Sequence, residues 1–428
     1  MSNSHLIRCH DCDRLQSYTL AEEGYQVRCN RCDALLDRNP EDSVNRTLAF
    51  ALTGLVLFFI ANLYPFLSLE LQGQNQSTIL FTGIMELYNQ GLVWLAVLVF
   101  FTIVLVPSVE LGGLVYILVP IKLSLPPLPG TKIVARIVYK LHHWSMMDIF
   151  MLGILVSMVK VTAMAEVIVG PAFYAFMILI FVVSATKRAF DPSIIWSVLT
   201  PESNSGNRKE VFNDTAVVIS CHSCHQLCEL PSDENSYSMI CPRCGSALHR
   251  RKPNSISKTW ALTLAAAILY IPANLLPVSV ITSLAGKQED TLISSVIYFF
   301  NTGSIPIALV IFTASILVPI LKLIILTLLL ISVQTGYSRQ RRERTKLFRI
   351  TEALGRWSMV DVFVVTVLVA MVKLGVIATI EAGPGIVFFA AVVIITMIAA
   401  TTFDPRLIWD HSKSQRIQKT TSVKLEST

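Results

Sequence analysis

The chain has 428 residues and a formal net charge of +6; 53% of its residues are hydrophobic and only 15% are charged. About a quarter of the residues of an ordinary soluble domain are charged, so this composition excludes a soluble globular protein. The apolar residues stand in blocks of about 20, the length that a helix needs to cross a bilayer. We therefore expect an all-α polytopic membrane protein. Its basic residues lie mostly between the blocks, as orientation signals do, and no nucleic-acid partner is expected.

The first 45 or so residues are polar, and no signal peptide is visible before the apolar run that starts near Leu48. This segment carries two CxxC pairs separated by sixteen residues, and the same pattern returns near the middle of the chain. Two such knuckles can fold together and present four thiolates tetrahedrally, as Zn²⁺ prefers. The sequence predicts two structural Zn²⁺ sites, whose ligands are Cys9, Cys12, Cys29, Cys32, Cys221, Cys224, Cys241 and Cys244.

A redox role for the CxxC pairs is disfavoured because they come in twos and no βαβ pattern surrounds them. Four sulfurs leave no open position on the metal, so these sites are not expected to be catalytic. The ninth cysteine, Cys228, has no counterpart in the first ribbon and is interpreted as an incidental thiol. His10, His222 and His225 lie in or next to the knuckles, but the cysteines already fill the coordination shell.

Four apolar blocks follow each ribbon, which predicts eight transmembrane helices in total. They cover residues 47–66, 92–121, 145–168 and 171–189, and then 258–277, 304–332, 357–379 and 384–402. The second block of each set is unusually long and contains a proline, Pro107 or Pro319, so a kinked or tilted helix is expected there.

The chain is a tandem duplication. A shift of 212 residues places Cys9 on Cys221 and Asn62 on Asn274, and after a one-residue insertion Trp144 falls on Trp357. This register holds over about 200 residues, which chance cannot explain. The predicted domains are ribbon 1 (1–45), transmembrane domain 1 (46–200), ribbon 2 (201–256), transmembrane domain 2 (257–410) and a cytoplasmic tail (411–428).

Basic residues are concentrated between the second and third blocks of each repeat, whereas the other loops carry almost none. The positive-inside rule therefore places both ribbons and both termini in the cytoplasm of a bacterial inner-membrane protein. An even number of helices per repeat makes the two repeats parallel. The segments 66–90 and 278–303 would then be periplasmic and available to a partner.

Ionisable residues inside apolar blocks are costly and point to function. We hypothesise a buried polar network of Asp148, Lys322, Ser315, Ser358, Asp361 and Thr396, with Glu110, Lys160 and Lys373 as further candidates. Such a network can relay protons. The alternative is that the two aspartates only anchor the membrane interface and that Lys160 and Lys373 extend to the headgroups.

Several motifs closely resemble the paraquat-inducible protein A family, which includes LetA-like inner-membrane proteins. They are P-A-N-L-L-P (272–277), I-L-V-P-I-L-K (316–322), G-R-W-S-M-V-D (355–361) and T-F-D-P-R-L-I-W-D (402–410). The resemblance implies a tetraspanin-like fold in each half. It also implies a periplasmic MCE-domain partner that forms a tunnel, transfer of phospholipid to or from that tunnel, and proton coupling through Asp148, Ser315, Lys322, Ser358 and Thr396.

The leading hypothesis is therefore a non-enzymatic lipid-transport subunit. Two rivals stay open, a scaffold that anchors the periplasmic partner and a membrane-bound metal or redox sensor. No ATP-binding P-loop motif stands in the chain, so hydrolysis by this subunit is not expected to drive transport.

Overall fold

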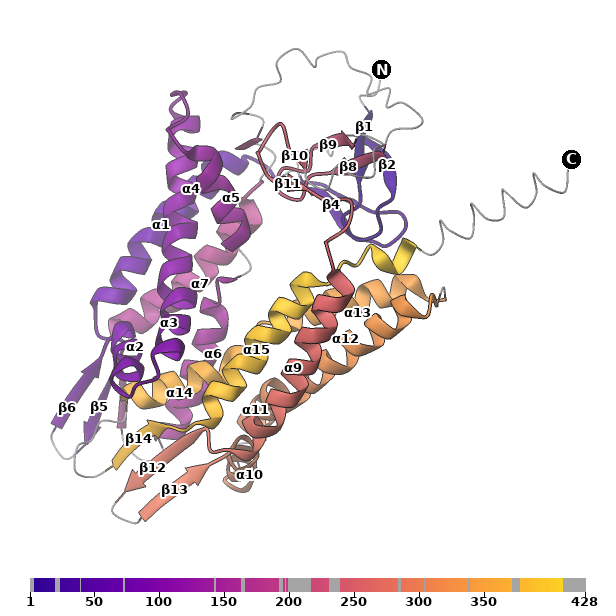
Figure 1. The fold of residues 1–428 in the computed structure, drawn as a ribbon. Helices are drawn as coiled ribbons and strands as arrows, with labels where there is room; N and C mark the ends of the chain where they lie inside the picture. Colours follow the sequence, from indigo (N-terminus) through magenta and orange to yellow (C-terminus); the bar gives the residue numbers. More distant parts are fainter. Residues whose placement is uncertain are drawn as a thin grey trace, which may run out of the picture.

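The computed structural model describes residues 4–19, 24–38, 40–71, 74–141, 144–162, 166–191, 195–196, 198, 217–230, 239–283, 286–303, 305–337, 339–371 and 378–410. Two helical units lie side by side, the first in indigo to magenta and the second in red to yellow (Figure 1). Small sheets lie at one end of both units and the cysteine ribbons at the other (Figure 1). We call these the sheet end and the ribbon end. Both units point the same way, as parallel repeats require.

The first repeat begins with a ribbon of two hairpins, β1 (Ser4–Arg8) with β2 (Leu15–Thr19), and β3 (Gln26–Arg28) with β4 (Leu35–Arg38). Its helices are α1 (Ser43–Leu63), α2 (Leu80–Asn89), α3 (Val93–Phe100), α4 (Val106–Lys122), α5 (Thr131–Leu141), α6 (Met147–Thr162) and α7 (Pro171–Ala189). At the sheet end, β5 (Leu67–Leu71), β6 (Gln74–Thr78) and β7 (Glu166–Val169) form an antiparallel sheet in the order β6-β5-β7.

The second repeat has the same element order. Its ribbon pairs β8 (Val217–Ser220) with β9 (Leu227–Leu230), and β10 (Met239–Ile240) with β11 (Ala247–Leu248). Its helices are α9 (Ser255–Leu275), α10 (Leu292–Asn301), α11 (Ile305–Ile311), α12 (Val318–Gln334), α13 (Arg341–Leu354), α14 (Val360–Met371) and α15 (Gly385–Thr402). Its sheet has the order β13-β12-β14, with β12 (Ser279–Ser283), β13 (Gly286–Asp290) and β14 (Ala378–Ala382).

The long second helix of each repeat contains a π-helical turn just before its proline. η1 (Phe101–Leu105) joins α3 to α4 ahead of Pro107, and η3 (Phe312–Leu317) joins α11 to α12 ahead of Pro319. Proline has no N–H and its ring collides with the preceding turn of an α-helix. A wider turn accommodates both effects and is a frequent feature of functional helices.

The described residues contain seven helices that are long and apolar enough to cross a membrane. They are Ser43–Leu63, Val93–Lys122, Pro171–Ala189, Ser255–Leu275, Ala308–Gln334, Arg341–Ala370 and Gly385–Asp410. The third expected helix of the first repeat is α6, which has 16 residues and is shorter than these seven. The chain is thus a multi-pass membrane protein, and the count of eight spans stays a prediction.

The two repeats meet where α6 crosses α14, and glycine makes the close approach possible. A Cβ added at Gly153 would lie 2.9 Å from Cβ of Phe363. Beside it, Ser157 Oγ donates a hydrogen bond to Val364 O across the interface, at 3.1 Å. The rings of Phe150 and Phe363 pack edge to face with centroids 5.4 Å apart. One hydrophobic core therefore runs through both repeats.

The Gly-Pro dipeptide after each third helix fixes the third strand at the sheet end. Gly170 N donates to Phe66 O at 3.0 Å, and a Cβ on Gly170 would lie 2.2 Å from Pro65 O. Gly383 stands in the same relation to Pro277 O, again at 2.2 Å. Any side chain at these two positions would collide with backbone, which explains why both repeats carry glycine there.

Candidate functional site

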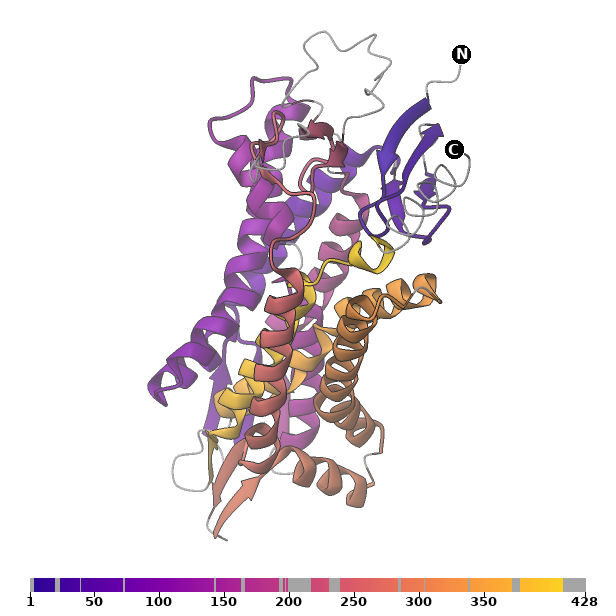
Figure 2. The same ribbon diagram turned by 45° about the vertical axis from the view of Figure 1, so that its right-hand side comes forward.

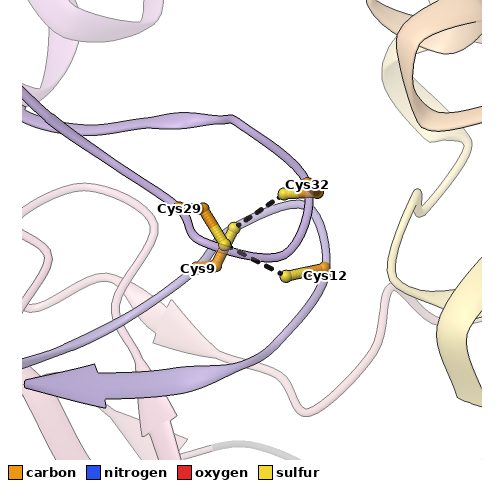
Figure 3. Close-up of side chains that lie close together, drawn as sticks. All are labelled: Cys9, Cys12, Cys29 and Cys32. Atoms are coloured by element: carbon orange, nitrogen blue, oxygen red, sulfur yellow. Dashed lines mark hydrogen bonds between the residues drawn. The ribbon is translucent and has the colours of Figure 1, made fainter. Parts of the chain in front are cut away.

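The four cysteines of the first ribbon converge on one point, as the spacing predicted (Figure 3). Cys9 Sγ lies 3.5 Å from Cys32 Sγ, and Cys12 Sγ lies 3.5 Å from Cys29 Sγ. The second ribbon repeats the arrangement, with closest pairs 3.5 and 3.6 Å apart among Cys221, Cys224, Cys241 and Cys244. In each set all four sulfurs lie within 4.8 Å of one another, and all eight cysteines are buried.

This donor set fits a metal ion. A tetrahedral Zn²⁺ with Zn–S bonds of about 2.3 Å has sulfur–sulfur edges of about 3.8 Å. The knuckle turns that aim the thiols are closed by Asp13 N donating to Cys9 O at 3.0 Å and Asp33 N donating to Cys29 O at 2.9 Å. Four thiolates would complete the shell, and the metal would crosslink two short hairpins. The structure thus provides two sites that can hold a metal, and Zn²⁺ itself stays a prediction.

Cys228 and His225 of the second ribbon lie in positions that suit a structural role. Cys228 is buried in β9, where burial and the neighbouring Cys241 raise the pKa of its thiol to about 12. It is therefore a neutral thiol at physiological pH. His225 N donates to Cys221 O at 3.0 Å and closes a knuckle turn, and its ring packs edge-on against Tyr139 with centroids 6.4 Å apart.

Each ribbon docks on the other repeat. The first ribbon lies beside the orange and yellow helices of the second repeat (Figure 2). Arg349 of α13 donates through Nε to Asp11 Oδ2 at 2.6 Å and through Nη2 to Cys32 O at 3.0 Å. Arg31 lies over the ring of Trp409, with its guanidinium carbon 4.2 Å from the ring centroid. A hydrophobic cluster continues from the ribbon cysteines into α12 and α13.

The second ribbon makes the equivalent contact with the first repeat (Figure 2). Arg136 of α5, which aligns with Arg349, donates through Nη1 to Gly245 O at 3.5 Å. Trp196, which aligns with Trp409, is buried in the hydrophobic cluster that contains the second ribbon's cysteines. The sequence did not predict this exchange, because nothing local in it indicates which transmembrane unit a ribbon will contact.

Five of the predicted network residues are buried in the second repeat. Lys322 of α12 is 1% exposed, and its Nζ donates to Thr396 Oγ1 of α15 at 2.7 Å. Asp361, at the start of α14, faces Ser315 of the π turn. Ser315 Oγ, Ser358 Oγ and Asp361 Oδ2 are buried and have no hydrogen-bond partner among the described residues. Burying such an atom without a partner costs about 1–3 kcal/mol, and proteins keep such atoms mainly at functional sites.

A small cavity of about 30 Å³ extends from Asp361 toward the sheet end. Its walls include Ser279 of β12, Ser295 of α10 and Val156 of the other repeat. A volume of this size and a polar lining can hold water. The cavity therefore offers Asp361 a polar connection toward the sheet end.

The first repeat has an apolar cavity in the corresponding place, also of about 30 Å³. Leu67 and Gly83 stand there where the second repeat has Ser279 and Ser295. The aspartate that aligns with Asp361 is Asp148, which is exposed. The two repeats have the same framework, but the polar cavity belongs to the second repeat alone among the described residues.

The first repeat has a different charged pair. Glu110, which aligns with Lys322, is 3% exposed, and its Oε2 lies 3.8 Å from Nζ of Lys187 on α7. Asp148 is near enough to act on the charge of Lys187. Lys187 was missed as a candidate because its place at the end of a transmembrane block looks like an ordinary interface anchor. The predicted network is therefore divided, and Asp148 lies with Glu110 and Lys187 rather than with Asp361.

Two predicted residues have no described side chain. Lys160 lies in helix α6 but its side chain is outside the described residues, and Lys373 lies outside them altogether. Their proposed roles stay predictions.

The duplicated fold, its two four-cysteine centres and its buried charged groups define a multi-pass membrane protein with tandem repeats. A model of the family described as paraquat-inducible protein A matches residues 44–200 and 256–413, one match in each repeat. The chain belongs to this family, which confirms the resemblance found in its motifs.

Curated relatives cover nearly the whole chain. "Intermembrane transport protein PqiA" of Escherichia coli is 33% identical over 407 residues, 94% of this chain and 95% of that protein. "Lipophilic envelope-spanning tunnel protein A" of E. coli is 31% identical over 407 residues, 95% and 92% of the two chains. A "probable intermembrane transport protein" of Haemophilus influenzae is 30% identical over 409 residues, 94% and 95%. No solved structure matches the chain, and the tetraspanin-like resemblance stays a prediction.

Proposed function

We propose that this chain is the inner-membrane subunit of an intermembrane lipid transport system. It passes phospholipid between the inner membrane and a tunnel formed by a periplasmic MCE-domain protein. The names of its relatives, which describe intermembrane transport and an envelope-spanning tunnel, support this proposal. They also argue against an enzyme.

The observation that carries the mechanism is the buried polar site of the second repeat. Lys322 has three N–H donors but one hydroxyl partner in the described structure, Thr396. Asp361 lies beside two serines and a cavity that can hold water. A charge with so few hydrogen-bond partners in a membrane interior is costly. Gaining or losing a proton there would therefore shift the equilibrium between conformations. We infer that protons drive transport through this site.

The α6–α14 crossing supplies the mechanical link in this proposal. Asp361 begins α14, and the same helix contacts Gly153 and Ser157 of the first repeat a few residues later. The cavities on the two sides of the crossing are too small for a lipid. Transport therefore requires the two repeats to move apart at the sheet end, where they would meet the tunnel.

The proposed orientation places the ribbon end and both termini in the cytoplasm and the sheets in the periplasm. The basic residues of α13 lie at the ribbon end, as the positive-inside rule requires. The sheets with α2 and α10 would form the surface for the MCE-domain partner. Zn²⁺ in both ribbons would have a structural role.

The first test is gentle purification of the tagged chain from its native membrane, with mass spectrometry of what co-purifies. The proposal expects an MCE-domain protein together with phospholipid. Recovery of neither, from intact metal-loaded protein, would contradict the transport-subunit proposal and favour a sensor.

The second test separates transport from scaffolding. In proteoliposomes that contain the chain and its partner, transfer of a fluorescent phospholipid is measured with and without a pH gradient. Lys322→Ala, Asp361→Asn and Thr396→Val should each slow transfer by about tenfold or more, because each removes a charge or its hydrogen-bond partner. Thr366→Val is the matched control, since that buried hydroxyl only bonds Val362 O of its own helix at 2.7 Å. A scaffold would keep the partner bound in all four variants and show no response to the gradient.

A further inference from the structure

A hollow of about 710 Å³ lies at the ribbon end, between the second ribbon and the start of α5. Three basic residues line it, namely Lys132 and Arg136 of α5 and Arg243 of the ribbon. None of the described residues that line it is an aspartate or a glutamate; two of the second ribbon's candidate metal ligands, Cys241 and Cys244, also line it. This excess of positive charge in a concave site favours an anion.

In the other half of the molecule, the arginine that aligns with Arg136 forms an ion pair with an aspartate. There Arg349 pairs with Asp11 of the first ribbon at 2.6 Å. The position that aligns with Asp11 is Ser223, whose Oγ is hydrogen-bonded to Ser246 Oγ at 3.0 Å. Among the described residues, Arg136 therefore has no carboxylate partner like the one that Asp11 gives its counterpart Arg349.

Arg136 keeps unused hydrogen-bonding capacity as a result. Its Nε is buried and has no hydrogen-bond partner in the described part of the chain, and its Nη1 reaches Gly245 O only at 3.5 Å, the outer limit for a hydrogen bond. A guanidinium presents its donors in a planar fork that suits two oxygens of a phosphate. Lys132 is exposed on the preceding turn of α5 and adds a second charge.

The rim of the hollow is apolar in a way that favours a lipid over a free anion. Ile240 of β10 is 68% exposed and Ile133 of α5 is 54% exposed, and both line the hollow. Ile137 follows one turn later on the same face of α5 and is also exposed. An amphipathic helix with such a face beside basic residues lies at the surface of a membrane, where acyl chains cover the isoleucines.

We propose that this hollow binds the phosphate of an anionic phospholipid from the leaflet at the ribbon end. Arg136 and Lys132 hold the phosphate oxygens, and the acyl chains lie along the exposed isoleucines of α5. The phosphate gives Arg136 the anionic partner that Asp11 gives Arg349 in the other half, and in this way the lipid completes the docking of the second ribbon. This site is separate from the polar site around Asp361 and does not depend on the direction of transport.

The test is native mass spectrometry of the delipidated full chain in detergent, titrated with phosphatidylglycerol. Phosphatidylcholine serves as the zwitterionic control, and inorganic phosphate is added as a competitor in a separate series. The double variant Lys132→Gln/Arg136→Gln should weaken phosphatidylglycerol binding by about tenfold or more, since it removes charged hydrogen bonds. The control double variant Lys140→Gln/Arg342→Gln loses the same charge from exposed positions outside the hollow and should bind as the unchanged chain does.

A second variant tests the site without removing a cation. Ser223→Asp restores the acid of the first ribbon, so it should pair with Arg136 and weaken phosphatidylglycerol binding to a similar degree. Elution on size exclusion identifies any variant that misfolds. The proposal is overturned if the hollow variants bind phosphatidylglycerol as the control does. It is equally overturned if phosphatidylcholine binds as tightly, or if millimolar inorganic phosphate displaces the lipid, which would indicate a site for a free anion.

Discussion

Replacing Arg349 with glutamine should release the first ribbon from the second repeat. The guanidinium makes two charge-assisted contacts across that interface, to Asp11 Oδ2 at 2.6 Å and to Cys32 O at 3.0 Å. A hydrogen bond to a charged group contributes about 1.5–3 kcal/mol. The side chain of Arg349 is 30% exposed, so water replaces part of this interaction, whereas Asp11 is 8% exposed and would lose its partner in a buried place. We expect docking to weaken by about 2–3 kcal/mol, or about 30- to 150-fold.

Hydrogen–deuterium exchange measures this directly. Trp409 N donates to Arg406 O at 2.9 Å in a turn that Arg31 covers, so exchange of a peptide from this segment should accelerate when the ribbon undocks. In delipidated protein, the mirror variant Arg136→Gln removes only a 3.5 Å contact to a carbonyl and should accelerate exchange in the first repeat by less than about threefold.

Arg342→Gln, on an exposed position of the same helix, is the control for lost charge. If Arg349→Gln changes exchange no more than this control does, the crossed contact does not hold the ribbon and the reasoning is refuted.

Four further substitutions have defined outcomes. Cys29→Ser should reduce the metal content from two ions to one per chain by elemental analysis, whereas Cys228→Ser, at a buried neutral thiol outside both sets, should leave two; equal losses would contradict the assignment. Gly153→Ala should lower the thermal midpoint in detergent, because its Cβ would lie 2.9 Å from Phe363, at a cost of about 1–3 kcal/mol. A Cβ added at Gly112 would have no atom within 4 Å. Gly112→Ala should therefore raise the midpoint, because alanine favours a helix over glycine by about 0.8–1.0 kcal/mol. Equal shifts would show that the α6–α14 approach is not tight.

The duplication predicted much of the architecture because equivalent residues had to occupy equivalent places. The apolar block expected at 384–402 is α15, Gly385–Thr402, and the block expected at 258–277 is α9, Ser255–Leu275. Block length and composition suffice for such helices, since membrane thickness sets their length. The convergence of the eight cysteines in two sets of four was predictable for a similar reason, because their spacing alone brings the knuckles together.

Long-range pairing was not predictable in the same way. β5 at Leu67–Leu71 pairs with β7 at Glu166–Val169, which lies almost 100 residues later in the chain. Nothing in the local sequence of either strand indicates which strand it pairs with. The Gly-Pro dipeptides at Gly170 and Gly383 recur in both repeats of the sequence, but the reason for them is a collision with backbone that only the folded chain reveals.

The polar network shows that the position of a residue along its helix does not determine which other side chains it contacts. Ser315, Lys322 and Thr396 were assigned to one network from the sequence, and the structure does bring Lys322 to Thr396. Asp148 was assigned to the same network, yet it is exposed and lies in the first repeat near Lys187. Depth along a helix follows from residue number, whereas the neighbouring helix that a side chain faces depends on tertiary packing.

The exchanged ribbons bear on how this chain arose. A single ancestral unit could make the same contacts only by trading ribbons with a second copy of itself, as domain-swapped dimers do. In such a symmetric dimer both docking sites carry the same residues. Fusion into one polypeptide removed that constraint, so that Asp11 could stand on one side and Ser223 on the other, and Lys322 opposite Glu110. The differences between the halves therefore depend on their being two distinct sequences, which a symmetric dimer of one short chain would not have.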